Sequence, residues 1–176
     1  MNNAEKKAIS LLKEEKVTEP PINIANIAKG LGLQLSYEPF DGIDDISGML
    51  YCDNENNILG INSAHSHTRQ RFSIAHEVGH FLLHKKKLFV DKKMRIAFRD
   101  SKSSMAIDKQ EIDANAFAAE ILMPREFIEN ELKKEMADIK DNIEIENIIS
   151  ALAKTFQVST QAMRYRLINL GIIDAE

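Results

Sequence analysis

The chain has 176 residues, of which 44% are hydrophobic and 28% charged, a composition typical of a soluble protein with one well-buried core or two small ones. The single cysteine, Cys52, excludes an internal disulfide framework and a cysteine zinc cage, so a metal site would have to use His, Asp and Glu. The net charge of −4 disfavours a protein whose main function is binding the phosphate backbone of a nucleic acid. The N-terminus leads into no signal sequence or membrane span, so we expect a cytoplasmic protein with no membrane partner.

The first third of the chain is predicted to contain two helices followed by a small sheet. Apolar residues at helical spacing predict helices over residues 4–12 and 24–31. Alternating apolar residues predict a strand over residues 33–37. The apolar runs at 47–51 and 58–61 flank a polar turn, which is typical of a β-hairpin.

From residue 68 onward the apolar pattern is helical. It predicts one helix over residues 68–84 and another over residues 109–121, joined by a basic stretch, residues 85–102, that we interpret as a solvated loop. The rest of the chain is predicted to be helical. We therefore predict an α+β fold with a catalytic-looking unit, residues 1–124, and a helical C-terminal region, residues 125–176.

The segment from His76 to His80 has the pattern H-E-x-x-H. On a helix the four-residue step places both imidazoles on one face, where they can bind one metal ion. At 100° per residue, Ser73, Glu77 and His84 fall with them in a sector of about 100°. A solvated polar stripe is the alternative interpretation, but residues 73–84 contain no Lys or Arg. His84 is rejected as a ligand because it lies a further turn along the helix.

A third ligand is predicted on the next helix. Glu111 lies in the apolar face of that helix, whereas Asp113 and Glu120 lie opposite, at about 180–200°, and are expected to face water. A carboxylate in an apolar face needs a cationic partner, so Glu111 is predicted to be the third metal ligand. Asn115 is one turn further along and is predicted to hydrogen-bond the second ring nitrogen of a ligating histidine; a backbone partner is the alternative.

Three protein ligands leave the fourth zinc position open, which is typical of a catalytic site. Glu77 is the candidate general base that would accept a proton from an attacking water and pass it to a departing amine. Tyr51, His84 and Tyr165 are candidates for stabilising the oxyanion.

These motifs together resemble the ImmA/IrrE metallopeptidases. The resemblance is carried by H-E-x-x-H within residues 71–80, by E-x-x-A-N-x-F-A-A at residues 111–119 and by L-M-P at residues 122–124. The Ser-Gly pair at 47–48 and the C-terminal pattern at 158–171 extend it over most of the chain.

The resemblance implies a thermolysin-like (gluzincin) zinc endopeptidase core with a helix-turn-helix-like C-terminal end. The ligands would be His76, His80 and Glu111, with Glu77 as base and with Mn²⁺ as an alternative to Zn²⁺. It further implies limited, site-specific cleavage of a DNA-binding repressor or antitoxin-type regulator encoded nearby, in a mobile element, prophage or stress operon.

Two rival functions remain open. The turn at residues 156–159 and the following helix, with Arg164 and Arg166, suggest a DNA-binding module. A silent partner that sequesters a regulator without cutting it is the second rival. For a peptidase, we expect the substrate to add as an extended strand to the hairpin at residues 47–61.

Overall fold

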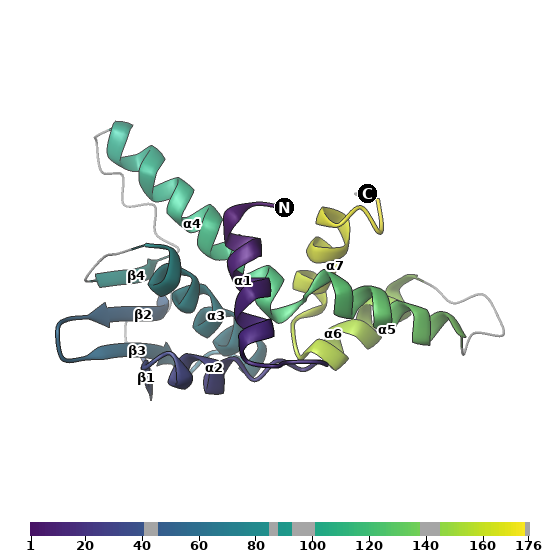
Figure 1. Cartoon of the computed structure of the whole chain (residues 1–176), viewed down its shortest axis with the longest axis horizontal. Coiled ribbons are helices and arrows are strands. Elements are labelled where there is room, and N and C mark those ends of the chain that lie inside the picture. Colours follow the sequence, from purple (N-terminus) through teal and green to yellow (C-terminus); the bar gives the residue numbers. More distant parts are fainter. Residues whose placement is uncertain (41–45, 85–87, 93–100, 138–144, 175–176) are drawn as a thin grey trace.

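The computed structural model describes residues 1–40, 46–84, 88–92, 101–137 and 145–174, and their side chains except at 88–92, 101–108 and 136–137. Seven helices and four strands lie in these ranges (Figure 1). In chain order they are α1 (Asn3–Glu14), α2 (Ile24–Gly30), β1 (Gln34–Glu38), β2 (Ile46–Cys52), β3 (Asn57–Asn62), α3 (His67–Leu83), β4 (Leu88–Lys92), α4 (Ser101–Leu122), α5 (Arg125–Ala137), α6 (Ile145–Phe156) and α7 (Thr160–Asn169). The predicted α+β class is confirmed.

The four strands form one mixed sheet in the order β1-β3-β2-β4. β2 and β3 are the expected antiparallel hairpin, in which Leu50 pairs with Leu59. β1 lies parallel to β3, and β4 lies antiparallel to β2. Because side chains alternate across a strand, Leu50 faces the core while Met49 and Tyr51 remain exposed on the other face.

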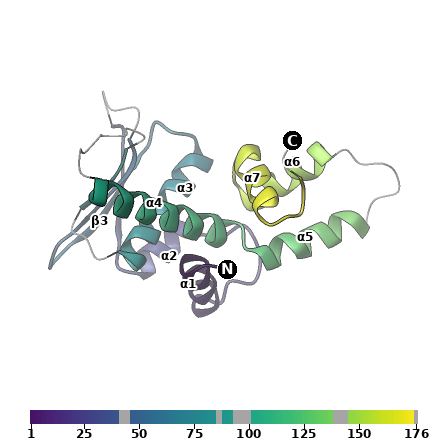
Figure 2. The ribbon, with the colours of Figure 1, turned by 90° about the horizontal axis from the view of Figure 1, so that it is seen from above.

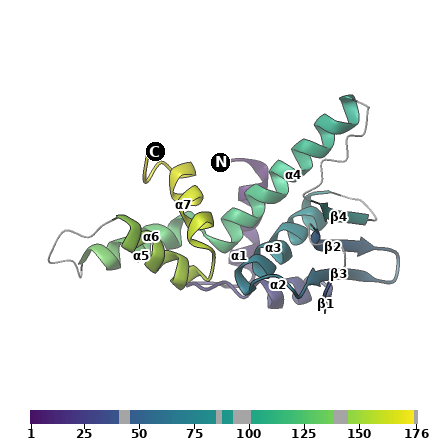
Figure 3. The same ribbon diagram turned by 180° about the vertical axis from the view of Figure 1, so that it is seen from behind.

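Helix α3 is the centre of the fold, because it contacts the sheet on one side and α4 on the other (Figure 3). A continuous core joins these three layers, and α1 packs against α4. The fully buried side chains at the centre of this core are Leu50, Leu59, Ile61, Val78, Phe117, Ala118 and Ile121.

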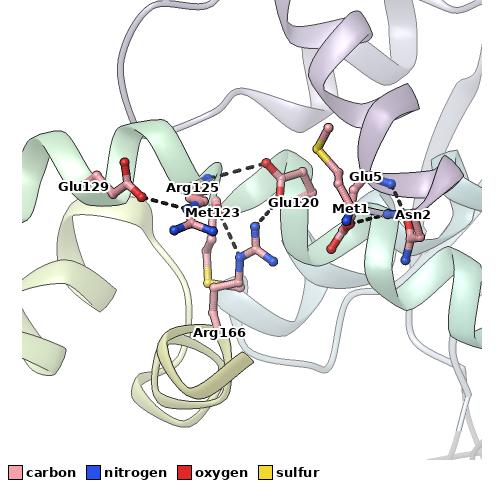
Figure 4. Close-up of polar contacts among 8 residues, drawn as sticks. All are labelled: Met1, Asn2, Glu5, Glu120, Met123, Arg125, Glu129 and Arg166. Atoms are coloured by element: carbon pink, nitrogen blue, oxygen red, sulfur yellow. Dashed lines mark hydrogen bonds and ion pairs between the residues drawn. The ribbon is translucent and has the colours of Figure 1, made fainter. Parts of the chain in front are cut away.

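The C-terminal helices extend from the end of α4, away from the sheet (Figures 1 and 2). Helices α6 and α7 pack against each other. Arg166 of α7 is buried and ion-pairs with the buried Glu120 of α4, and its Nε donates to the Met123 carbonyl at 3.0 Å (Figure 4). A charged pair therefore fixes the last helix to α4.

Two features of the sheet differ from the sequence-based expectation. Residues 88–92 lie in a stretch that we interpreted as a solvated loop, but they form strand β4; residues 85–87 and 93–100 lie outside the described part of the chain. The hairpin predicted to accept the substrate consists of β2 and β3, the two inner strands of the sheet. The expectation of strand addition there was wrong, because both strands already have neighbours on both sides.

Helix α4 begins at Ser101, eight residues before the predicted start at 109. None of the described helices is long and apolar enough to cross a membrane.

Candidate metal centre

Helix α3 begins after Ser66, whose side chain accepts a hydrogen bond from the backbone of Arg69 and so caps the helix. Within it, His76 and His80 are 3% and 2% exposed, and their ring centroids are 4.6 Å apart. The alternative interpretation of a solvated polar stripe is therefore wrong for these two histidines. Both are buried on the side of α3 that contains the closest approach to α4.

That close approach depends on Gly79. A Cβ placed there would lie 3.2 Å from the Ala114 Cα and 3.2 Å from the Phe117 ring, which is tighter than ordinary contact. A larger residue at 79 would push the helices apart. The pair of small residues thus lets Glu111, one turn before Ala114, reach across to the histidines.

Three donor atoms converge between the two helices. The Nε2 atoms of His76 and His80 are 3.0 Å apart, and each lies 3.2 Å from a different carboxylate oxygen of Glu111. The three possible donor atoms lie within 4.8 Å of one another. Two imidazoles and a carboxylate are a donor set that suits Zn²⁺ and other divalent transition metals, so these residues fit a metal ion.

Asn115 lies behind this cluster. Its Oδ1 is 3.1 Å from Nδ1 of His76, as expected for a residue that holds the ring by its second nitrogen. With the amide oxygen as acceptor, Nδ1 is the donor, and Nε2 faces His80 and Glu111. The ring is thus oriented with the coordinating nitrogen toward the metal position.

Electrostatics favours the metal-binding forms of two of these groups. Burial disfavours the imidazolium form and is the main reason that the pKa of His80 lies below its usual value. Burial alone would raise the pKa of Glu111, but its hydrogen bonds with His76 and His80 outweigh that effect and hold its pKa well below the usual range. Neutral imidazole and ionised carboxylate are the forms that coordinate metals.

Glu77 follows His76 on α3 and is completely buried against strand β2. A Cβ placed on Gly48 would lie 3.3 Å from Cγ and 3.4 Å from Oε1 of Glu77. Gly48 therefore makes room for the Glu77 carboxylate. In the sequence Gly48 belongs only to the family resemblance, although a glycine inside an apolar strand is a general signal of close approach.

The burial that helical phase predicts for Glu111 and Glu120 is partly wrong. The Glu111 side chain is 43% exposed, whereas Glu120, which we expected to face water, is buried and paired with Arg166. The reason is that α7 covers that side of α4 and supplies a cation. Phase on an isolated helix cannot show which side a later segment will cover.

The three candidates for oxyanion stabilisation are in different positions. Tyr51 is exposed on the face of the sheet opposite to the buried Leu50, so it is directed away from the core. His84 donates from Nε2 to the Gln110 carbonyl at 3.3 Å and is outside the donor cluster, in agreement with its rejection as a ligand. Tyr165 is exposed on α7, beside the N-terminal half of α3.

The α+β fold thus presents a candidate His-His-Glu metal site between α3 and α4. The chain belongs to the Peptidase_M78 family, described as the IrrE N-terminal-like domain, whose model matches residues 28–168. The predicted ImmA/IrrE relationship is confirmed by this match.

Two relatives extend the comparison. "Uncharacterized immunity region protein 2" of Bacillus phage phi105 is 26% identical over 157 residues, which are 81% of this chain and 92% of the phage protein. Among solved structures, a Mycobacterium tuberculosis transcriptional regulator matches 96% of this chain with a TM-score of 0.59 and 16% identity. The chain spans 56% of the length of that regulator, and the likeness shows a shared fold.

Proposed function

We propose that the chain is a metal-dependent endopeptidase in which His76, His80 and Glu111 hold zinc, or manganese in its place. The observation that carries this proposal is the convergence of their three donor atoms within 4.8 Å, at a helix contact that Gly79 makes possible. Three protein ligands would leave one zinc position open, which is typical of a catalytic rather than a structural site. The buried Glu77, next to His76, supports the same interpretation because it could act as a general base.

The chemistry divides between the metal and the chain. When bound, zinc supplies Lewis-acid polarisation of a carbonyl and lowers the pKa of a water. The Glu77 carboxylate accepts the proton of the attacking water and later gives it to the departing amine. Asn115 keeps the His76 ring oriented through Nδ1, and Gly48 leaves space in which the Glu77 carboxylate can lie.

The proposed substrate is a DNA-binding repressor or antitoxin-type regulator encoded nearby, cut at one site. Family membership and the phage immunity-region relative support this class of substrate. In this proposal residues 1–124 are a thermolysin-like peptidase core and residues 125–176 a helix-turn-helix-like region that helps to bind the substrate. The protein would act where such regulators do, in the cytoplasm.

A DNA-binding function is disfavoured by the contacts of α7. Arg166 is 5% exposed and paired with Glu120, and Arg164 is paired with Glu146 of α6. Phosphate contacts need accessible cations, and both arginines of the helix that would enter the groove are occupied within the protein. Sequestration without cleavage is the second alternative, and the Glu77 variant below separates it from proteolysis.

The test is cleavage of the helix-turn-helix repressor encoded beside the gene. The zinc-loaded protein should release one discrete pair of fragments, and Glu77→Gln or a chelator should abolish them. Glu126→Gln, on the exposed first turn of α5, is the matched control and should cleave as the wild type does. Cleavage that survives both Glu77→Gln and chelation would contradict the mechanism, and binding without any cleavage by the wild type would favour sequestration.

A further inference from the structure

A groove lies between the N-terminal half of α3 and helix α7, and we call it the α3–α7 groove. Its volume is about 470 Å³, within the range of about 300–1,000 Å³ typical of ligand pockets. Phe72 of α3 forms one wall, and Val158, Ala162 and Tyr165 form the other. The remaining lining residues are polar: Ser66, Thr68, Arg69, Ser159 and Gln161.

The groove neighbours the candidate metal centre along α3, because Phe72 lines the groove and contacts His76. Phe72 precedes His76 by one helical turn on the same face of α3, and their ring centroids are 6.3 Å apart. An extended peptide rises by roughly 3.3 Å per residue. A peptide whose reacting carbonyl lies at the His-His-Glu cluster thus reaches the groove after about two residues.

The one cation on the α3 wall already has a partner within the protein. Arg69 donates from Nε and Nη2 to Ser47 Oγ, at 3.1 and 2.8 Å. This contact joins α3 to Ser47 of β2, the residue directly before Gly48. Two of the Arg69 donors are therefore occupied within the protein, and the apolar side chains are the part of the groove that the proposal below uses.

Two buried arginines hold the walls of the groove in place. Arg71 of α3 is 8% exposed, and it donates to the carbonyls of Phe156 and Gln157 at 3.4 and 3.1 Å, at the turn before α7. Arg166 fixes the same helix to α4. A pocket whose walls are fixed before binding loses less free energy in ordering side chains.

We propose that the α3–α7 groove is a specificity pocket that takes a large apolar side chain, such as Leu, Met or Phe, about two residues from the bond that is cut. This inference rests on the proposed peptidase function and names the substrate feature that the site reads. It gives the C-terminal region a defined task, because one wall of the pocket is built from α7 and the turn before it.

The test measures peptide binding separately from cleavage. A randomised decapeptide library is selected on zinc-loaded Glu77→Gln protein, and the retained sequences are read. We expect enrichment of Leu, Met or Phe at one position. Ala162→Phe, which fills the groove from α7, should lower the affinity for the enriched peptides by about tenfold or more, the scale of losing one buried apolar side chain.

Two further variants control for folding. Thr160→Phe adds the same ring to an exposed position of the same helix outside the groove, and it should leave the affinity unchanged. Tyr165→Ser removes a wall whose side chain is 60% exposed, so it should fold normally and also weaken the selected peptides.

The outcomes separate this inference from the proposed function. Wild-type protein that cuts the selected peptides, with no apolar preference sensitive to Ala162→Phe and Tyr165→Ser, would overturn the pocket and leave the peptidase intact. Apolar peptides that bind in the groove but are never cut would support the pocket and contradict the peptidase. A library in which no peptide is retained, or concentration-dependent dimers abolished by Ala162→Phe, would overturn the pocket as a peptide site.

Discussion

Gly79 and Ala114 form the contact on which the candidate metal centre depends. A Cβ on Gly79 would lie 3.2 Å from the Ala114 Cα and 3.3 Å from its carbonyl oxygen, so the backbones of α3 and α4 meet at this point. His80 is the next residue on α3, and Glu111 is one turn earlier on α4. The distance of closest approach between the helices therefore sets the distance between the ligands.

The first prediction concerns Gly79→Ala. In a helix interior this change ordinarily stabilises a protein by about 0.5–1 kcal/mol. Here the added methyl meets backbone atoms that cannot move alone, so we expect lower stability and at least tenfold weaker zinc binding. Gly30→Ala is the matched control, because its Cβ would meet only a Glu15 oxygen at 3.9 Å. Denaturant melts and chelator competition measure both effects; a stabilised Gly79→Ala protein with normal zinc affinity would refute the helix-contact argument.

The second prediction concerns Asn115→Ala. Removing the acceptor for His76 Nδ1 releases the ring orientation, and losing such a partner typically lowers metal affinity by about 10–100-fold. Asn115→Asp retains an acceptor and should retain most of the affinity. Asn130→Ala, at an exposed position of α5, should have no effect. Equal zinc affinity in the wild type and Asn115→Ala would show that the contact has no such role.

The third prediction concerns Gly48→Ala. Its methyl would lie 3.3 Å from Cγ of Glu77, so it should displace the proposed general base while leaving the three proposed metal ligands in place. We expect a fall in kcat of about tenfold or more with unchanged zinc stoichiometry. Gly60→Ala, on the neighbouring strand, meets the Phe40 ring at 3.5 Å and the Met49 carbonyl oxygen at 3.7 Å, which are ordinary contact distances, and should behave as the wild type. Loss of zinc in Gly48→Ala would place the glycine in metal binding instead.

The fourth prediction is a double-mutant cycle on Arg166 and Glu120. Breaking a buried ion pair at one end leaves an uncompensated charge, so Arg166→Met should lower the free energy of unfolding by about 3–5 kcal/mol. Adding Glu120→Met should restore much of that loss. The more exposed pair of Arg164 and Glu146 is the control, with an expected coupling of about 0–1 kcal/mol. A single variant that costs no more than the surface pair would mean that the buried pair does not anchor α7.

The juxtaposition of His76 and His80 could be predicted from sequence because it depends on local periodicity. The His76 and His80 spacing fixes both rings on one face of α3 whatever surrounds the helix. Helical phase favours Glu111 over Glu120 because it predicts that Glu111 is buried and that Glu120 faces water. In the structure Glu120 is the more deeply buried of the two. Glu120 is buried because Arg166, 46 residues later, reaches it, and helical phase carries no information on such a distant contact.

The sheet shows the same limit. The hairpin of β2 and β3 followed from alternation and a polar turn, but its position inside the sheet depends on β1 and β4, which join it from other parts of the chain. Strand β4 lies in a lysine-rich stretch. The lysines favoured the interpretation of a solvated loop, although the stretch contains a short apolar run. The sequence gives Gly48 and Gly79 only as parts of the motifs. Their structural role is the absence of a Cβ where two elements meet closely, and this can be recognised only when both elements are placed in three dimensions.

The most direct test of the central claim is an anomalous-scattering map at the zinc edge from zinc-loaded crystals of the whole chain. We expect one zinc per chain, at about 2.0–2.2 Å from Nε2 of His76, Nε2 of His80 and a carboxylate oxygen of Glu111. Glu77 should lie close by but should not coordinate the zinc. A zinc ion held elsewhere, or one coordinated by Glu77 in place of Glu111, would contradict the claim.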